Sequence, residues 1–106
     1  MIVRESINFE RKKDPKEAMN IGLRPKMAKM ISFIHMESRD AEHHYFGSQG
    51  NGNTIHALKA FLWYMFYDEM TPDIAFEKAC KVWEITAKDQ QNMIKNTLNK
   101  ELGITL

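Results

Sequence analysis

The hydrophobic and polar positions of this chain follow the three- and four-residue spacing of α-helices over most of its length. After Pro25, apolar and small side chains recur on one side of a helix and charged side chains on the other. The series consists of Met27, Met30, Ile31, Ile34, Ser38, Ala41 and Tyr45. We expect one helix here, preceded by a shorter helix that begins at Asp14-Pro15 and ends at Gly22.

A third helix is expected after residues 47–53. That segment is rich in glycine and asparagine, which favour turns, and glycine also loses more conformational entropy than other residues in a regular element. Thr54 is expected to cap the helix, and Glu69 to lie near its end.

Two more helices are predicted in the last third of the chain. Thr71-Pro72 has the order of a capping residue and a first-turn proline, so a helix should open there and run to Trp83. Its buried stripe is expected to contain Ile74, Ala75, Ala79, Val82 and Trp83. Thr86 is expected to cap a helix over residues 87–101, with Gly103 as its stop and Met93, Ile94, Leu98 and Leu102 facing inward.

The pattern therefore predicts an all-α fold, a small helical bundle of four to five helices. Residues 1–13 lack a helical period, and we interpret them as an extended N-terminal arm. We expect two parts, an arm with a short helix over residues 1–24 and a helical domain over residues 25–106.

A run of seven large apolar residues interrupts the amphipathic pattern. It reads Phe61, Leu62, Trp63, Tyr64, Met65, Phe66 and Tyr67. A surface helix buries a stripe only about 100° wide, so this segment must be covered on several sides, by its own fold or by another protein. Aromatic residues also favour strands, but the preceding Ala57, Leu58 and Ala60 favour helix. We expect Trp63, Tyr64 and Tyr67 to bind a partner, and the chain to form a homo-oligomer.

Composition narrows the classes of function. The formal net charge of +1 gives no electrostatic basis for binding nucleic acid or an anionic membrane. The apolar run is shorter than the roughly 20 residues that span a bilayer, and charges at Arg4 and Glu5 leave no apolar signal segment. The single Cys80 cannot form an internal disulfide and is expected to be structural. We expect a cytoplasmic protein that is not an enzyme and has no cofactor.

Residues 35–44 gather histidines and charged side chains. On a helix Arg39, His43 and His44 lie close together, and with the loop 47–53 they could hold a small anionic nucleotide. Imidazole and carboxylate one turn apart also suit a metal ion. Because the spacing matches no metal-binding motif, we expect no metal site.

Residues 79–96 loosely resemble the turn and recognition helix of a helix-turn-helix. The following polar face, with Lys88 and Lys95, could reach base edges. Glu84 occupies the turn position where glycine is usual, and residues 72–106 contain as many acidic as basic side chains. Phosphate binding would therefore lack its main source of affinity, so we do not expect DNA as a partner.

The N-terminal segment resembles a module of small bacteriophage-encoded proteins of mostly unassigned function. The residues that carry the resemblance are Glu5-Ser6-Ile7-Asn8-Phe9-Glu10-Arg11, Asp14-Pro15-Lys16-Glu17-Ala18-Met19 and Ile21-Gly22. The resemblance covers about residues 4–24. This chain departs from the module at Lys12 and Asn20, where glycine is usual. The module precedes varied sequences and carries no known catalytic residue.

The resemblance implies a phage protein in a bacterial host and a segment suited to docking. We therefore expect a non-catalytic protein that binds a host or phage protein, in host takeover or against host defence, with Phe9 and Arg11 of the arm as anchors. One alternative is an oligomeric sponge that sequesters a nucleotide signal through Arg39, His43 and His44. Another is a DNA-binding helix-turn-helix at residues 79–96.

Overall fold

The computed structural model describes residues 15–106, with side chains from residue 22 onward. This part of the chain contains five α-helices and no strands. They are α2 (Pro15–Met36), α3 (Ser38–Phe46), α4 (Gly52–Phe66), α5 (Pro72–Val82) and α6 (Lys88–Leu102). The all-α prediction is confirmed, and the apolar run is helical as far as Phe66.

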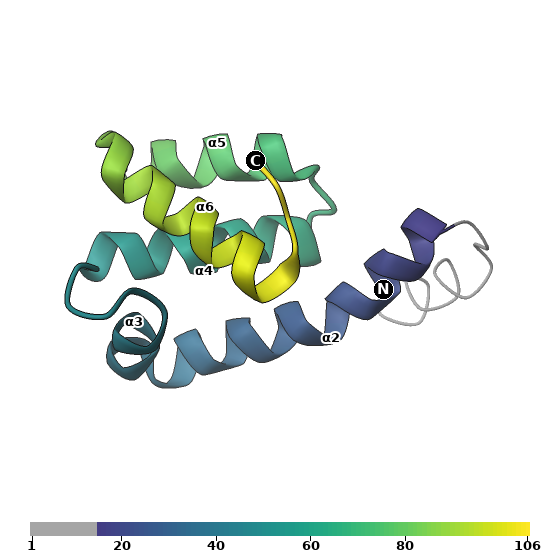
Figure 1. Ribbon diagram of the computed structural model, residues 1–106, viewed down its shortest axis with the longest axis horizontal. Coiled ribbons are helices and arrows are strands. Elements are labelled where there is room, and N and C mark those ends of the chain that lie inside the picture. The colour runs from purple at the N-terminus through teal and green to yellow at the C-terminus, as the bar shows by residue number, and fades with distance from the viewer. Residues whose placement is uncertain (1–14) are drawn as a thin grey trace.

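Helix α4 is the centre of the bundle, and each of the other described helices packs against it. Figure 1 shows α4 between α5 and α2, with α6 crossing it. The side chains of Ile55, Leu58, Phe61 and Leu62 are almost fully buried. A helix that is covered on several sides needs apolar residues around much of its circumference, which explains the composition of α4.

Helix α2 is a single helix of 22 residues, so the predicted stop at Gly22 and the new start at Pro25 are wrong. Glycine costs about 1 kcal/mol inside a helix, and proline about 3 kcal/mol because it removes a backbone hydrogen bond. The next turns bury Met27, Met30 and Ile34 in the core. Burial of each large side chain contributes about 1.5–3 kcal/mol, which is enough to outweigh both penalties.

The predicted helix from Pro25 to Tyr45 is interrupted at Glu37. This residue has φ −140° and ψ 62°, outside the helical region, and it separates α2 from α3. The break redirects the chain, so that α3 also packs against α4 and α6. Ala41 and Phe46 of α3 are thereby buried in the same core as Ile34 of α2.

Two predicted caps lie at different residues. The cap of α4 is Asn51, whose side-chain oxygen accepts a hydrogen bond from the backbone N–H of Thr54 at 3.0 Å. Thr54 is itself buried, and its hydroxyl lies between the side-chain amides of Asn51 and Gln90. The cap position of α6 is Ala87, not Thr86. A buried polar group needs partners, so Thr54 serves as a link from α4 to α6.

Two other helix ends lie at the predicted residues. Thr71 is the N-cap of α5, with Pro72 as its first residue, and Gly103 ends α6 with φ 70°. The C-terminal end of α4 is covered by Arg24, whose Nη1 donates a hydrogen bond to the carbonyl oxygen of Phe66 at 3.2 Å. A cation at this end of a helix is favoured by the helix dipole.

The turn between α5 and α6 is a Schellman motif. The N–H of Ile85 bonds to the carbonyl of Cys80 at 2.8 Å, and the N–H of Glu84 to that of Lys81 at 3.4 Å. Glu84 stands where such motifs usually have glycine, and its φ is 56°. A residue with a Cβ atom pays roughly 1–2 kcal/mol in this left-handed conformation.

We expect Glu84→Gly to raise the free energy of unfolding by about 0.5–1 kcal/mol, because the strain exceeds the extra chain entropy of glycine. Glu84→Ala is the matched control, since it removes the same side chain and keeps the Cβ atom. Urea unfolding followed by circular dichroism measures both. An equal change in the two variants would contradict the backbone explanation.

Candidate functional site

Helix α4 leaves Trp63 and Tyr67 exposed at its C-terminal end. Their exposed fractions are 44% and 47%, and their ring centroids lie 4.3 Å apart. The two residues are four positions apart and so lie on the same side of the helix. Phe61 and Leu62 of the same run are fully buried. The core therefore covers one side of the run, and the side with Trp63 and Tyr67 faces solvent.

Helix α5 buries small side chains, packs the half-buried Phe76 against Phe61, and exposes two large aliphatic side chains. Ile74 and Val82 are 57% and 54% exposed, so their predicted burial is wrong. The buried residues are Ala75, Ala79 and Cys80. Small side chains let α5 lie close to α4, and the larger neighbours are then left outside the contact.

Lys78 connects the exposed row of α5 to α4. Lys78 lies one helical turn from both Ile74 and Val82, and its Nζ is 4.7 Å from the ring centroid of the half-buried Tyr64. We call the combined surface the aromatic face. Its apolar members are Trp63, Tyr64, Tyr67, Ile74 and Val82. The three α4 residues that were predicted to bind a partner thus share one surface.

A shallow hollow opens at the part of the aromatic face that Trp63 and Tyr64 form. At its edge His56 stacks on Trp83, with ring centroids 4.9 Å apart and an interplanar angle of 25°. The hollow measures about 220 Å³ and is lined by His56, Lys59, Ala60, Trp63, Tyr64 and Trp83. Its walls are mostly aromatic, so it could receive an apolar side chain of another protein.

Arg39, His43 and His44, the residues proposed to hold a nucleotide, line one surface of α3. The same surface carries Asp40 and Glu42, and together these side chains line a shallow depression. Two carboxylates beside one guanidinium do not favour an anion. His44 packs instead against aromatic neighbours, with its ring centroid 4.9 Å from that of Tyr45.

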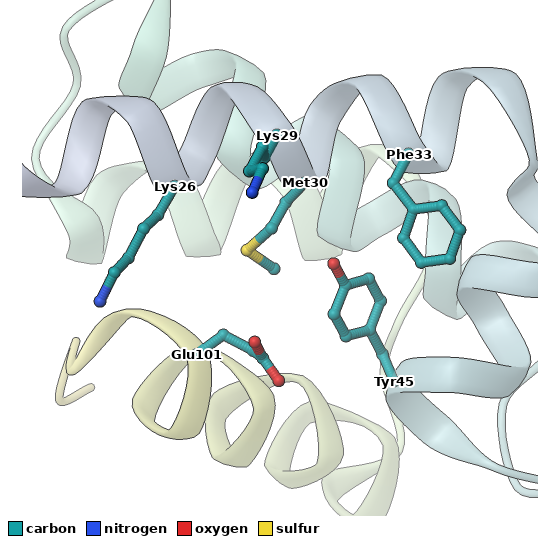
Figure 2. Close-up of a pocket in the computed structure, with 6 residues that line it drawn as sticks. All are labelled: Lys26, Lys29, Met30, Phe33, Tyr45 and Glu101. Carbon is teal, nitrogen blue, oxygen red and sulfur yellow. The ribbon is translucent and has the colours of Figure 1, made fainter.

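The sequence pattern missed a groove between α2, α3 and α6. It measures about 470 Å³ and is lined by Lys26, Lys29, Met30, Phe33, Tyr45 and Glu101 (Figure 2). These residues come from three helices. The spacing of residues within one helix could not predict that these three helices meet. The sequence indicated only that Lys26 and Lys29, three positions apart, lie on the same side of a helix.

In the region predicted as a possible recognition helix, half of the polar side chains make contacts within the protein. Gln90 contacts Thr54, and Gln91 donates a hydrogen bond to the carbonyl of Ile85 at 2.8 Å. Lys95 lies with Nζ 5.4 Å from the ring centroid of Phe76. Lys88, Asn92 and Asn96 remain exposed. Fewer side chains are therefore available to base edges than the sequence indicated.

Cys80 is buried in α5. Burial raises the pKa of its thiol, and the charge of Lys95 opposes that shift in part. A protonated thiol is a weak nucleophile, so the environment favours a structural role. Among the residues that the structure describes, no group of three or more His, Cys, Asp or Glu side chains could hold a metal ion.

The predicted arm residues Phe9 and Arg11 lie outside the described residues. No protein-family model, curated protein or solved structure matches the chain. In the described part of the chain, no helix has the length and apolar character needed to cross a membrane. The fold and the exposed surfaces are therefore the basis for a functional proposal.

We expect Phe61→Ala to lower the free energy of unfolding by about 3–5 kcal/mol, because the ring is fully buried and its removal leaves a cavity. Trp63→Ala removes a larger side chain but should cost only about 1 kcal/mol, since nearly half of it faces solvent. Urea unfolding of both variants measures the difference. A loss of similar size in Trp63→Ala would mean that the exposed ring is part of the core.

Proposed function

We propose that this protein is a small, non-catalytic binding protein that docks on a host or phage protein through the aromatic face. The observation that carries the proposal is the exposed pair Trp63 and Tyr67. Tryptophan and tyrosine dominate the binding energy of many protein interfaces, because they bury large area at a low cost in side-chain entropy. The phage context rests on the resemblance of residues 4–24 alone.

The arrangement of the rings supports binding. Trp63 and Tyr67 already contact each other, so less side-chain freedom is lost when a partner covers them. Ile74 and Val82 extend the apolar area onto a second helix. Several exposed large apolar residues on one surface typically mark an interaction site.

The charges around the aromatic face are mixed. Lys59 and Lys78 lie beside the rings, and Asp68 directly follows Tyr67 in the chain. A surface whose edge carries both positive and negative side chains can pair with another surface of the same kind. A second copy of this chain presents such a surface. We therefore propose that the same face also forms a homo-oligomer.

We expect light scattering of the purified chain at tens of micromolar to give a mass above that of one 12.4 kDa chain. Tyr67→Glu should shift the species to the monomer and keep the helical circular dichroism, because a buried unpaired charge disfavours the interface while the side chain is exposed in the protomer. His43→Glu on the exposed side of α3 is the control and should leave the mass unchanged. A monomeric wild-type chain would contradict self-association.

The arm residues give a separate prediction. Deletion of residues 1–13 should leave the helical circular dichroism and the melting temperature nearly unchanged. The predicted start signal of the first helix, Asp14-Pro15, lies after the deleted segment and is kept. Capture of the partner protein should be lost, and Phe9→Ala or Arg11→Ala should weaken it. A large fall in melting temperature would instead assign the apolar arm residues to the core or to a subunit interface.

A further inference from the structure

We propose that the groove between α2, α3 and α6 binds a nucleotide, with the phosphate at Lys26 and Lys29 and a guanine base at Tyr45 and Glu101. This inference goes beyond the proposed function, because the groove and the aromatic face share no residue. It also differs from the surface of Arg39, His43 and His44, where the sequence placed a nucleotide.

The two ends of the groove differ in chemistry. Figure 2 shows Lys26 at one end, Phe33 and Tyr45 at the other, and Lys29 and Met30 between them, with Glu101 on the opposite helix. Both lysines are exposed, and three positions on one helix place them on the same side, so their flexible side chains can converge on one anion. Two ammonium groups and one carboxylate leave a net positive charge in the groove, which suits a phosphate group.

The aromatic end is a preformed wall. The ring centroids of Phe33 and Tyr45 lie 5.9 Å apart in an edge-on arrangement, and His44 packs against both from the side. Met30 forms the floor and is buried. A flat heterocycle gains about 1–3 kcal/mol from stacking on an aromatic side chain, and a thioether adapts to the shape of its ring.

Glu101 determines which base of a nucleotide the groove favours. A carboxylate accepts hydrogen bonds but donates none, so it favours a ring edge with two neighbouring N–H groups. Guanine has such an edge, whereas adenine presents a lone pair beside its single amino group. Burial, and to a lesser extent the charge of Glu101, raises the pKa of Tyr45. The Tyr45 hydroxyl therefore stays protonated and can donate a hydrogen bond to a bound ligand.

The size of the groove also fits. A volume of about 470 Å³ lies within the range of small-molecule pockets, roughly 300–1,000 Å³. Inorganic phosphate would occupy only the lysine end and would leave the aromatic wall and Glu101 unused. A nucleotide would use all three parts of the groove.

The test is a titration of the full-length ¹⁵N-labelled protein with GMP, AMP and inorganic phosphate, followed by amide chemical shifts. We expect GMP to perturb residues around Lys29, Tyr45 and Glu101 and to bind several-fold more tightly than AMP. Phosphate alone should bind at least about tenfold more weakly than GMP, because it lacks the stacking contact. Equal affinity for GMP and phosphate, or shifts centred on Trp63, would overturn the proposal.

Matched variants assign the contacts. Lys26→Ala with Lys29→Ala should weaken GMP binding about tenfold or more, because each ammonium group makes a charge-assisted contact. Lys81→Ala with Lys88→Ala removes the same charge from exposed positions elsewhere and should have little effect. An equal loss in both pairs would indicate nonspecific attraction and overturn the site.

Glu101→Gln tests the base contact separately. An amide both donates and accepts, so the preference for GMP over AMP should disappear while the fold is kept, as circular dichroism would verify. An unchanged preference would contradict the role of Glu101. Tyr67→Glu should leave GMP binding intact, so failure of the aromatic face and failure of the groove can be told apart.

Discussion

Burial of α4 is the constraint on which the rest of the structure depends. Each of the other described helices packs against it, and Leu58, Phe61 and Leu62 lose their contact with water completely. Each of these side chains contributes about 1.5–3 kcal/mol when it is buried. Local costs elsewhere, such as Pro25 inside α2 and the left-handed Glu84, are tolerated because they allow other helices to reach α4.

The same constraint explains where apolar surface remains. A helix of this composition has more apolar circumference than the other four described helices cover. Trp63 and Tyr67 are left on the open side, and α5 adds Ile74 and Val82 because its small residues face α4. The aromatic face is thus a consequence of how the core is packed, and its use by a partner is our proposal for function.

The polar links of the bundle connect residues far apart in the chain. Arg24 reaches the end of α4 at Phe66, and Asn53 at the start of α4 donates a hydrogen bond to the carbonyl of Trp83 at 3.2 Å. These contacts fix the ends of α4 relative to α2 and α5. The groove of Lys29, Tyr45 and Glu101 likewise exists only because α2, α3 and α6 meet. A nucleotide bound there would add a further link between these helices.

The sequence by itself determined the all-α class, the stop at Gly103 and the sides of the helices that bear Ile34 or Leu98, because spacing and capping are local properties. Only the tertiary structure decided the continuity of α2 through Pro25 and the exposure of Ile74. Those outcomes depend on burial energy gained against other helices, and that energy has no signature in a window of a few residues. The aromatic residues of α4 could be predicted as binding candidates because they are contiguous in the sequence. The groove could not be predicted, because its residues come from three helices that meet only in the folded protein.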